Sequence, residues 1–133
     1  MVCQVSLDDV GALVHEVEVG CWVYLFFERE RWFAQSPHFN ILGDGATKDE
    51  ALRQFLDFLQ ANIEWHLENG QSLDKMIQPA HPDVFAKLER ITFSKPKKLD
   101  ASKFDIPEHL KPMIECLVAQ DAGNASRRDH MAR

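Results

Sequence analysis

Apolar residues alternate with other residues over one stretch near the start of the chain. Every odd position from residue 17 to residue 27 is apolar, and the even positions become aromatic at Trp22, Tyr24 and Phe26. A period of two with β-branched and aromatic residues is typical of a strand with one buried face. Because the second half of the stretch is apolar on both faces, we expect it to lie centrally in a sheet.

Two shorter apolar runs follow. Residues 32–35 come after the charged segment 28–31, and the two runs 17–27 and 32–35 therefore predict a hairpin. Residues 39–42 predict a third strand, which we expect to end at the Gly43-Asp44-Gly45 turn.

The next segment predicts a long helix. Thr47 and Glu50 have the spacing of a capping box, in which the side chain at each position accepts from a backbone amide of the other. Five apolar residues then recur at helical spacing, and Asn69-Gly70 ends the pattern. The single apolar stripe that should face the sheet consists of Leu52, Phe55, Leu56, Leu59 and Ile63.

The remaining segments complete the predicted architecture. Residues 88–93 alternate well enough to be a last strand, and Pro112 favours a short C-terminal helix over residues 112–119. The expected fold class is α+β: an antiparallel β-sheet in β-β-β-α-β order with one long helix packed on one face, plus the short C-terminal helix. We place a domain boundary at residue 94.

Charge divides the chain at the same point. The 133 residues carry a formal charge of −6; residues 1–94 hold 7 basic and 15 acidic side chains, and residues 95–133 hold 8 basic and 6 acidic ones. An acidic body is a poor general binder of nucleic-acid phosphates. Three dispersed cysteines, no signal-peptide pattern and no long apolar run predict a cytoplasmic protein with reduced thiols and no membrane segment.

One constellation resembles a known family. The aromatic strand, the charged turn, the Ser36-Pro37 turn and the segment Gly45-Ala46-Thr47-Lys48-Asp49-Glu50-Ala51-Leu52 are together similar to the HicB-like family. The resemblance covers about residues 20–93 and rests mainly on the helix-opening motif, in which Gly45, Thr47, Glu50 and Ala51 match.

The resemblance implies a non-catalytic, protein-binding module. HicB-like antitoxins use a degenerate ribonuclease-H-like domain to neutralise a small, basic, RNA-cleaving toxin. The alternative is a stand-alone inhibitor or regulator, for example a phage-encoded one, that uses the same fold to block a larger protein assembly. Many relatives also bind DNA through a C-terminal domain. Residues 103–128 superficially resemble a ribbon-helix-helix order, but Pro112 would interrupt its first helix, so we expect no direct DNA binding.

Catalytic and metal-binding patterns are weak. The six histidines include no HxxxH or HExxH pair, and Cys21 lies within the predicted apolar strand without the context of a nucleophile. We therefore expect no enzyme activity, no cofactor and no metal site.

The aromatic residues offer a candidate interface. Trp22, Tyr24 and Phe26 share the even face of the first strand, opposite the face assigned to the helix, and Trp32 is close in sequence. They are either core residues covered by the chain ends or an exposed patch for a partner or a second copy. We name these four residues as the predicted interface of a homodimer or a complex.

Overall fold

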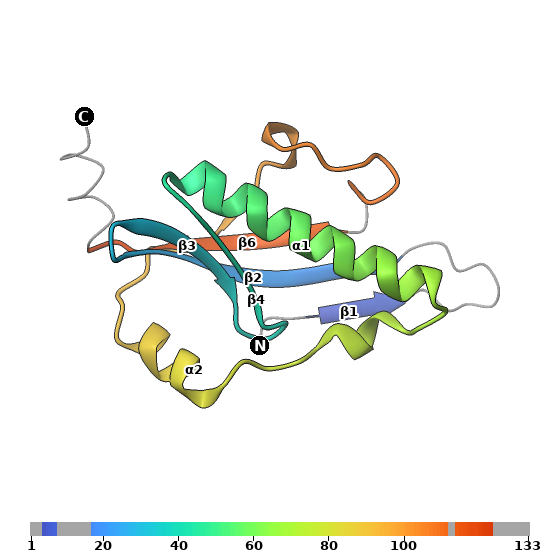
Figure 1. The fold of residues 1–133 in the computed structure, drawn as a ribbon, viewed down its shortest axis with the longest axis horizontal. Helices are drawn as coiled ribbons and strands as arrows, with labels where there is room; N and C mark the ends of the chain where they lie inside the picture. Colours follow the sequence, from blue (N-terminus) through green and yellow to red (C-terminus); the bar gives the residue numbers. More distant parts are fainter. Residues whose placement is uncertain (1–3, 8–16, 112–113, 124–133) are drawn as a thin grey trace.

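The computed structural model describes residues 4–7, 17–111 and 114–123. Six strands form one sheet, and a long helix lies across one of its faces (Figure 1). The sheet order is β4-β3-β2-β6-β5, and β1 pairs with the first part of β2. The elements are β1 (Gln4–Leu7), β2 (Val17–Glu28), β3 (Arg31–Ser36), β4 (Ile41–Gly45), α1 (Lys48–Glu68), the 3₁₀ turn η1 (Leu73–Met76), α2 (Pro82–Glu89), β5 (Lys97–Lys98), the 3₁₀ turn η2 (Ala101–Lys103) and β6 (Ile114–Gln120). The α+β class is confirmed.

The predicted hairpin joins β2 and β3. Glu28 pairs with Arg31, which leaves Arg29 and Glu30 as a two-residue loop. Both loop residues have positive φ, 52° and 64°, as a type I′ turn requires. The guanidinium of Arg31 donates to the Asp44 carboxylate of β4 at 2.8 Å, so a side-chain bond also holds this end of the hairpin.

Two glycines of β4 allow α1 to approach the sheet closely. The sequence pattern placed Gly43 and Gly45 in a turn that ends the third strand; instead both lie within β4. A Cβ atom at Gly43 would lie 2.6 Å from the Ala51 carbonyl oxygen, and one at Gly45 would lie 2.8 Å from the Ala51 amide nitrogen. The glycines are therefore needed for helix contact rather than for a turn.

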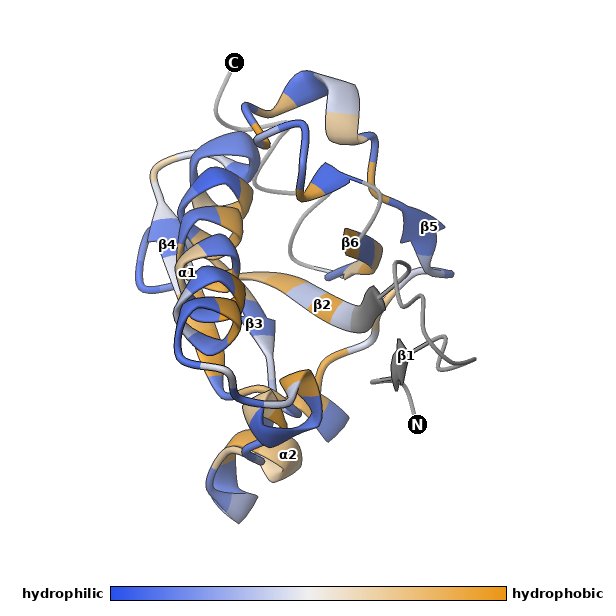
Figure 2. Ribbon diagram, turned by 90° about the vertical axis from the view of Figure 1, so that its right-hand side faces the viewer, coloured by the Kyte–Doolittle hydropathy of each residue, from blue (hydrophilic) through white to orange (hydrophobic). Residues whose placement is uncertain are grey.

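The helix α1 begins and packs as predicted. The Thr47 hydroxyl accepts from the Glu50 amide at 3.1 Å, and the Glu50 carboxylate accepts from the Ala46 amide at 2.9 Å. The predicted apolar stripe is buried, and Figure 2 shows the apolar side of α1 turned toward the strands. Asn69 caps the C-terminal end, and Gly70 follows with a φ of 65°.

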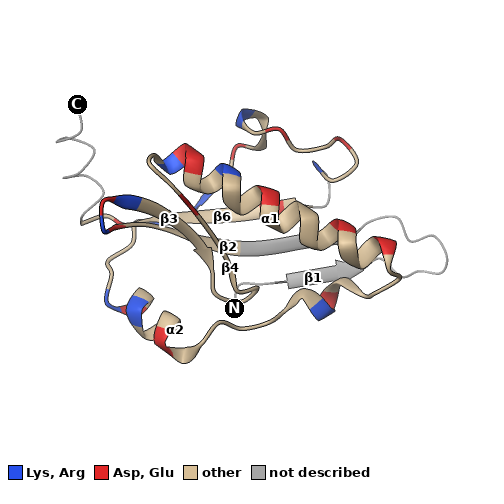
Figure 3. Cartoon of the chain, viewed as in Figure 1, with Lys and Arg blue, Asp and Glu red and all other residues tan. Residues whose placement is uncertain are grey.

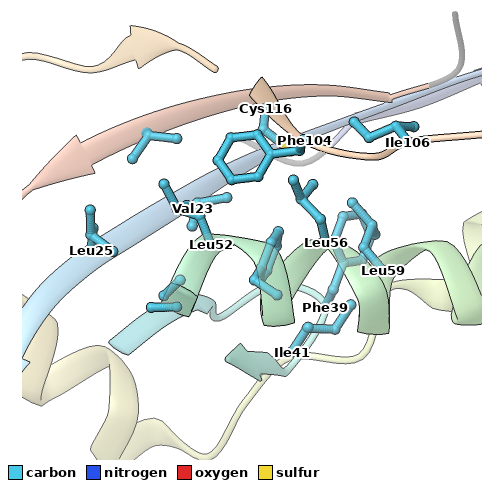
Figure 4. Packing of buried hydrophobic residues seen from close by; sticks show 14 of the residues in the cluster. Val23, Leu25, Phe39, Ile41, Leu52, Leu56, Leu59, Phe104, Ile106 and Cys116 are labelled. Carbon is cyan, nitrogen blue, oxygen red and sulfur yellow. The ribbon is translucent and has the colours of Figure 1, made fainter. Parts of the chain in front are cut away.

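The core lies between α1 and the sheet. Its side chains come from α1, η1, the strands β2, β3, β4 and β6, the turn before β4 and the connection between β5 and β6; Figure 4 shows part of this cluster. Val23 and Leu25 of β2 are almost fully buried, which confirms that the odd face of this strand is the helix-facing one. The members labelled in Figure 4 are Val23, Leu25, Phe39, Ile41, Leu52, Leu56, Leu59, Phe104, Ile106 and Cys116.

The last predicted strand was wrong. Residues 82–89 form the helix α2, with Pro82 at its first position and the His81 ring accepting from the Asp83 amide at 3.0 Å. A proline at the first helical position loses no intrahelical hydrogen bond. Of residues 88–93, Phe93 joins the sheet through an isolated bridge to Asp121.

The predicted C-terminal helix was also wrong where it can be compared. Residues 114–120 form β6, and residues 112–113 lie outside the described part of the chain. The pairing of β6 with β2 is parallel, from Val19↔Ile114 to Leu25↔Gln120, so the sheet is mixed rather than antiparallel. Cys116 and Val118 are buried on the helix-facing side because alternate residues of a strand share a face. The mildly basic segment thus supplies an interior strand of the sheet.

Candidate protein-binding surfaces and a lysine-lined pocket

The four aromatic residues of the predicted interface lie on two faces of the sheet. Trp32 pairs with Phe27 across the hairpin, and their rings meet edge to face at 5.2 Å on the side that faces α1. Trp32 is 4% exposed, and the Lys48 ammonium lies 5.2 Å from the centre of its ring. The structure therefore separates Trp32 from Trp22, Tyr24 and Phe26.

The opposite face of the sheet is partly covered. Phe26 is 1% exposed; its ring stacks on Phe33, and the Lys87 ammonium of α2 lies 5.0 Å from its centre. Trp22 and Tyr24 are half-buried, and the Tyr24 ring meets Phe93 edge to face at 5.0 Å. Burial raises the pKa of Tyr24 above its usual value. Phe26 is thus a core residue, whereas Trp22 and Tyr24 keep surface that a second molecule can contact.

A second aromatic surface lies on α1, outside the apolar stripe that the sequence pattern predicts. Phe58 and Trp65 are 49% and 55% exposed. They are seven residues apart, which at about 3.6 residues per turn places them two turns apart on the same side of the helix. We call these two residues, with the neighbouring acidic row Asp57, Glu64 and Glu68, the α1 stripe. The sequence already indicated this surface, because both aromatic residues lie outside the predicted apolar stripe of the helix.

The α1 stripe is acidic, and its two aromatic side chains are exposed among the described residues. No Lys or Arg occurs between residues 54 and 69, and Figure 3 shows acidic positions along this part of α1. The connection between β5 and β6 covers one flank of α1: Arg53 lies over the Phe104 ring at 5.5 Å, and His109 Nε2 lies 3.4 Å from the Glu64 carboxylate. Arg53 and Glu64 are about a third of a turn around the axis from Phe58.

A pocket of about 310 Å³ opens between the start of α1, β5 and η2. Four lysines and two aspartates line it, together with apolar side chains that also belong to the core. Hydrogen bonds from the hydroxyl and amide of Ser102 hold the pKa of Asp100 below its usual value. The charged residues of the pocket are Lys48, Asp49, Lys97, Lys98, Asp100 and Lys103.

Several titratable side chains outside these surfaces are held in structural contacts. Glu28 accepts from Lys87 at 2.9 Å, and burial lowers the pKa of His38, whose ring meets Phe85 edge to face. The Cys116 side chain is buried in the core. Within the described ranges no three His, Cys, Asp or Glu side chains gather where they could hold a metal ion.

Comparison with known proteins leaves the family open. No family model, curated protein or solved structure matches the chain. The resemblance to HicB-like antitoxins therefore stays a prediction. In the part of the chain that the structure describes, α1 and α2 are too short or too polar to cross a membrane.

Proposed function

We propose that this chain is a non-catalytic protein-binding module of the HicB type, which neutralises a small basic toxin by covering its surface. The observation that carries the proposal is the α1 stripe, where two exposed aromatic side chains lie beside an acidic row. Trp and other aromatic residues supply much of the binding energy in protein interfaces, and exposed aromatic patches mark association surfaces.

The charge of the stripe supports a basic partner. Asp57 and Glu68 are exposed, and the segment 54–69 offers a partner no competing cation except a protonated histidine. Complementary potentials accelerate encounter and disfavour partners of the same sign. A basic protein with an apolar contact patch fits this surface better than an acidic one.

The alternative, a stand-alone inhibitor that blocks a larger assembly, is favoured by a different observation. Residues 114–120 belong to β6 inside the sheet, so they do not form the first helix of the ribbon-helix-helix order that this part of the sequence resembled. A regulator that does not bind DNA through this segment fits the stand-alone inhibitor better than it fits an antitoxin that also represses its own operon.

Co-expression tests the proposal. The tagged chain is produced with the product of the adjacent small basic reading frame, and we expect a stable complex that no longer cleaves RNA. A Phe58→Ala, Trp65→Ala double variant should lose the toxin while its circular dichroism and thermal transition stay unchanged.

Three outcomes would redirect the interpretation. Leu67→Ala and Ile77→Ala remove exposed apolar side chains outside the stripe, so an equal loss of binding in these controls would contradict the assigned surface. Failure of the wild-type chain to retain the toxin would contradict the antitoxin proposal. Recovery of a large assembly from host lysate instead would support the alternative.

A further inference from the structure

We propose that the lysine-lined pocket binds a small organic phosphomonoester, such as a mononucleotide or a phosphorylated metabolite. The pocket is separate from the α1 stripe, and this inference does not depend on the proposed function. Its volume of about 310 Å³ is at the small end of ligand sites, which commonly measure about 300 to 1,000 Å³. A compact ligand is therefore favoured over an extended one.

The charge in the pocket favours a dianion. Four lysine ammonium groups and two aspartate carboxylates line the space, which leaves a formal charge of +2 in a chain of charge −6. A phosphomonoester carries nearly two negative charges at neutral pH. Lysine binds phosphate as a mobile point charge, and several lysines on one opening attract phosphate from solution.

Two of the lysines form no close ion pair. Within the described ranges no carboxylate lies at ion-pair distance from Lys97 or Lys103, and Lys103 interacts with Asp100 only as a nearby charge that helps to lower the pKa of this aspartate. Lys98 lies 3.4 Å from Glu115, and the Lys48 ammonium lies over Trp32. We therefore assign the phosphate contact to Lys97 and Lys103, which approach the opening from β5 and η2.

The floor of the pocket is apolar. Leu25, Leu52, Phe104 and Val118 line it and are each less than a tenth exposed. An inorganic phosphate would leave this floor in contact with water, whereas a ring or short chain attached to the phosphate would cover it. Mixed lining of this kind is typical of sites for organic ligands that carry one charged group.

The site is built from side chains rather than from the helix end. In the first turn of α1 the Glu50 amide already donates to the Thr47 hydroxyl, and just before the helix the Ala46 amide donates to Glu50. Asp49 and Glu50 also carry negative charge at this helix end, which disfavours an anion seated directly on the first turn. The lysines therefore decide whether the pocket binds phosphate.

Calorimetric titration of the full chain with phenyl phosphate, inorganic phosphate and phenol tests the inference. Phenyl phosphate should bind at least about tenfold more tightly than either component, and added salt should weaken it. A Lys97→Gln, Lys103→Gln double variant should lose at least about tenfold in affinity. Lys75→Gln with Lys95→Gln removes the same charge elsewhere and should bind as the wild type does.

Further titrations identify the source of the ligand. Tighter binding of uridine monophosphate than of glucose 6-phosphate would assign the site to nucleotides, and the reverse order would assign it to sugar phosphates. The inference is overturned if phenyl phosphate does not bind at millimolar concentration. It is equally overturned if inorganic phosphate binds as tightly, or if the two double variants behave alike.

Discussion

Single residues on one strand have different surroundings even where the sequence pattern treats them alike. Trp22, Tyr24 and Phe26 have the same parity on β2, yet Phe26 is buried under Lys87 and Phe33 while Trp22 and Tyr24 keep exposed surface. Periodicity assigns a face of the sheet, and the cover on that face comes from α2 and Phe93, which are distant in sequence. The predicted homodimer interface therefore now rests on Trp22 and Tyr24.

Substitution at two of these positions separates core from interface. Phe26→Ala should lower the free energy of unfolding by about 3 to 5 kcal/mol, because it leaves a cavity in a fully buried site. Trp22→Ala should cost clearly less and should shift the sedimentation mass of the predicted homodimer toward the 15.3 kDa monomer. Urea unfolding and analytical ultracentrifugation measure the two effects. A monomeric wild-type chain at high concentration would refute the dimer.

At the scale of elements, local signals succeeded where both halves of an interaction lie close together in the chain. The capping box of Thr47 and Glu50 and the stripe from Leu52 to Ile63 predicted α1, and the alternation of β2 and β3 predicted their hairpin. The helix predicted over residues 112–119 was wrong because the strand partner of residues 114–120, β2, lies about a hundred residues earlier. A short apolar run alone fits either a strand or a helix.

The candidate site was less predictable than the fold for the same reason. The lysine-lined pocket joins Lys48 to Lys97 and Lys103, and no spacing in the sequence relates these residues. Phe58 and Trp65 were visible as aromatic residues outside the buried stripe of α1. Their exposure depends on which flank the connection containing Phe104 covers, which is a tertiary effect.

The contact between α1 and β4 yields a prediction at the element scale. Gly43→Ala should destabilise the chain by about 1 to 3 kcal/mol, because the new Cβ would overlap the backbone of α1 near Ala51 and Phe55. Leu42→Ala, at an exposed neighbouring position, is the control and should change stability little. Thermal and urea denaturation measure the difference, and equal stability of the two variants would contradict the tight approach.

For the whole molecule, the charge division along the sequence is not a structural division. The segment after residue 94 contributes β5 and β6 to the sheet, and Phe104, Ile106, Leu110, Cys116 and Val118 to the core. Its lysines meet the first turn of α1 at the pocket, so the change in sign along the chain becomes a local positive patch on an acidic surface. A domain made of residues 1–94 alone would leave one side of β2 unpaired.

Truncation tests whether the fold depends on the segment after residue 94. A chain of residues 1–94 should show no cooperative unfolding transition and poor dispersion of its amide NMR signals, because it lacks β6 and five core side chains. In the full-length chain, Val118→Asp should have a similar effect because it places a charge in the same core. A well-dispersed spectrum of the 1–94 fragment would show that β6 is dispensable.

The parallel pairing of β2 with β6 also sets the timing of folding during synthesis. At about 5 to 20 residues per second, a ribosome needs roughly 5 to 20 s to progress from the end of β2 to the end of β6. Through that interval the apolar β2 has an open hydrogen-bonding edge, which is the kind of surface that chaperones bind and that aggregates form on. The finished sheet, and any activity that depends on it, can therefore appear only after nearly all of the described chain has been made.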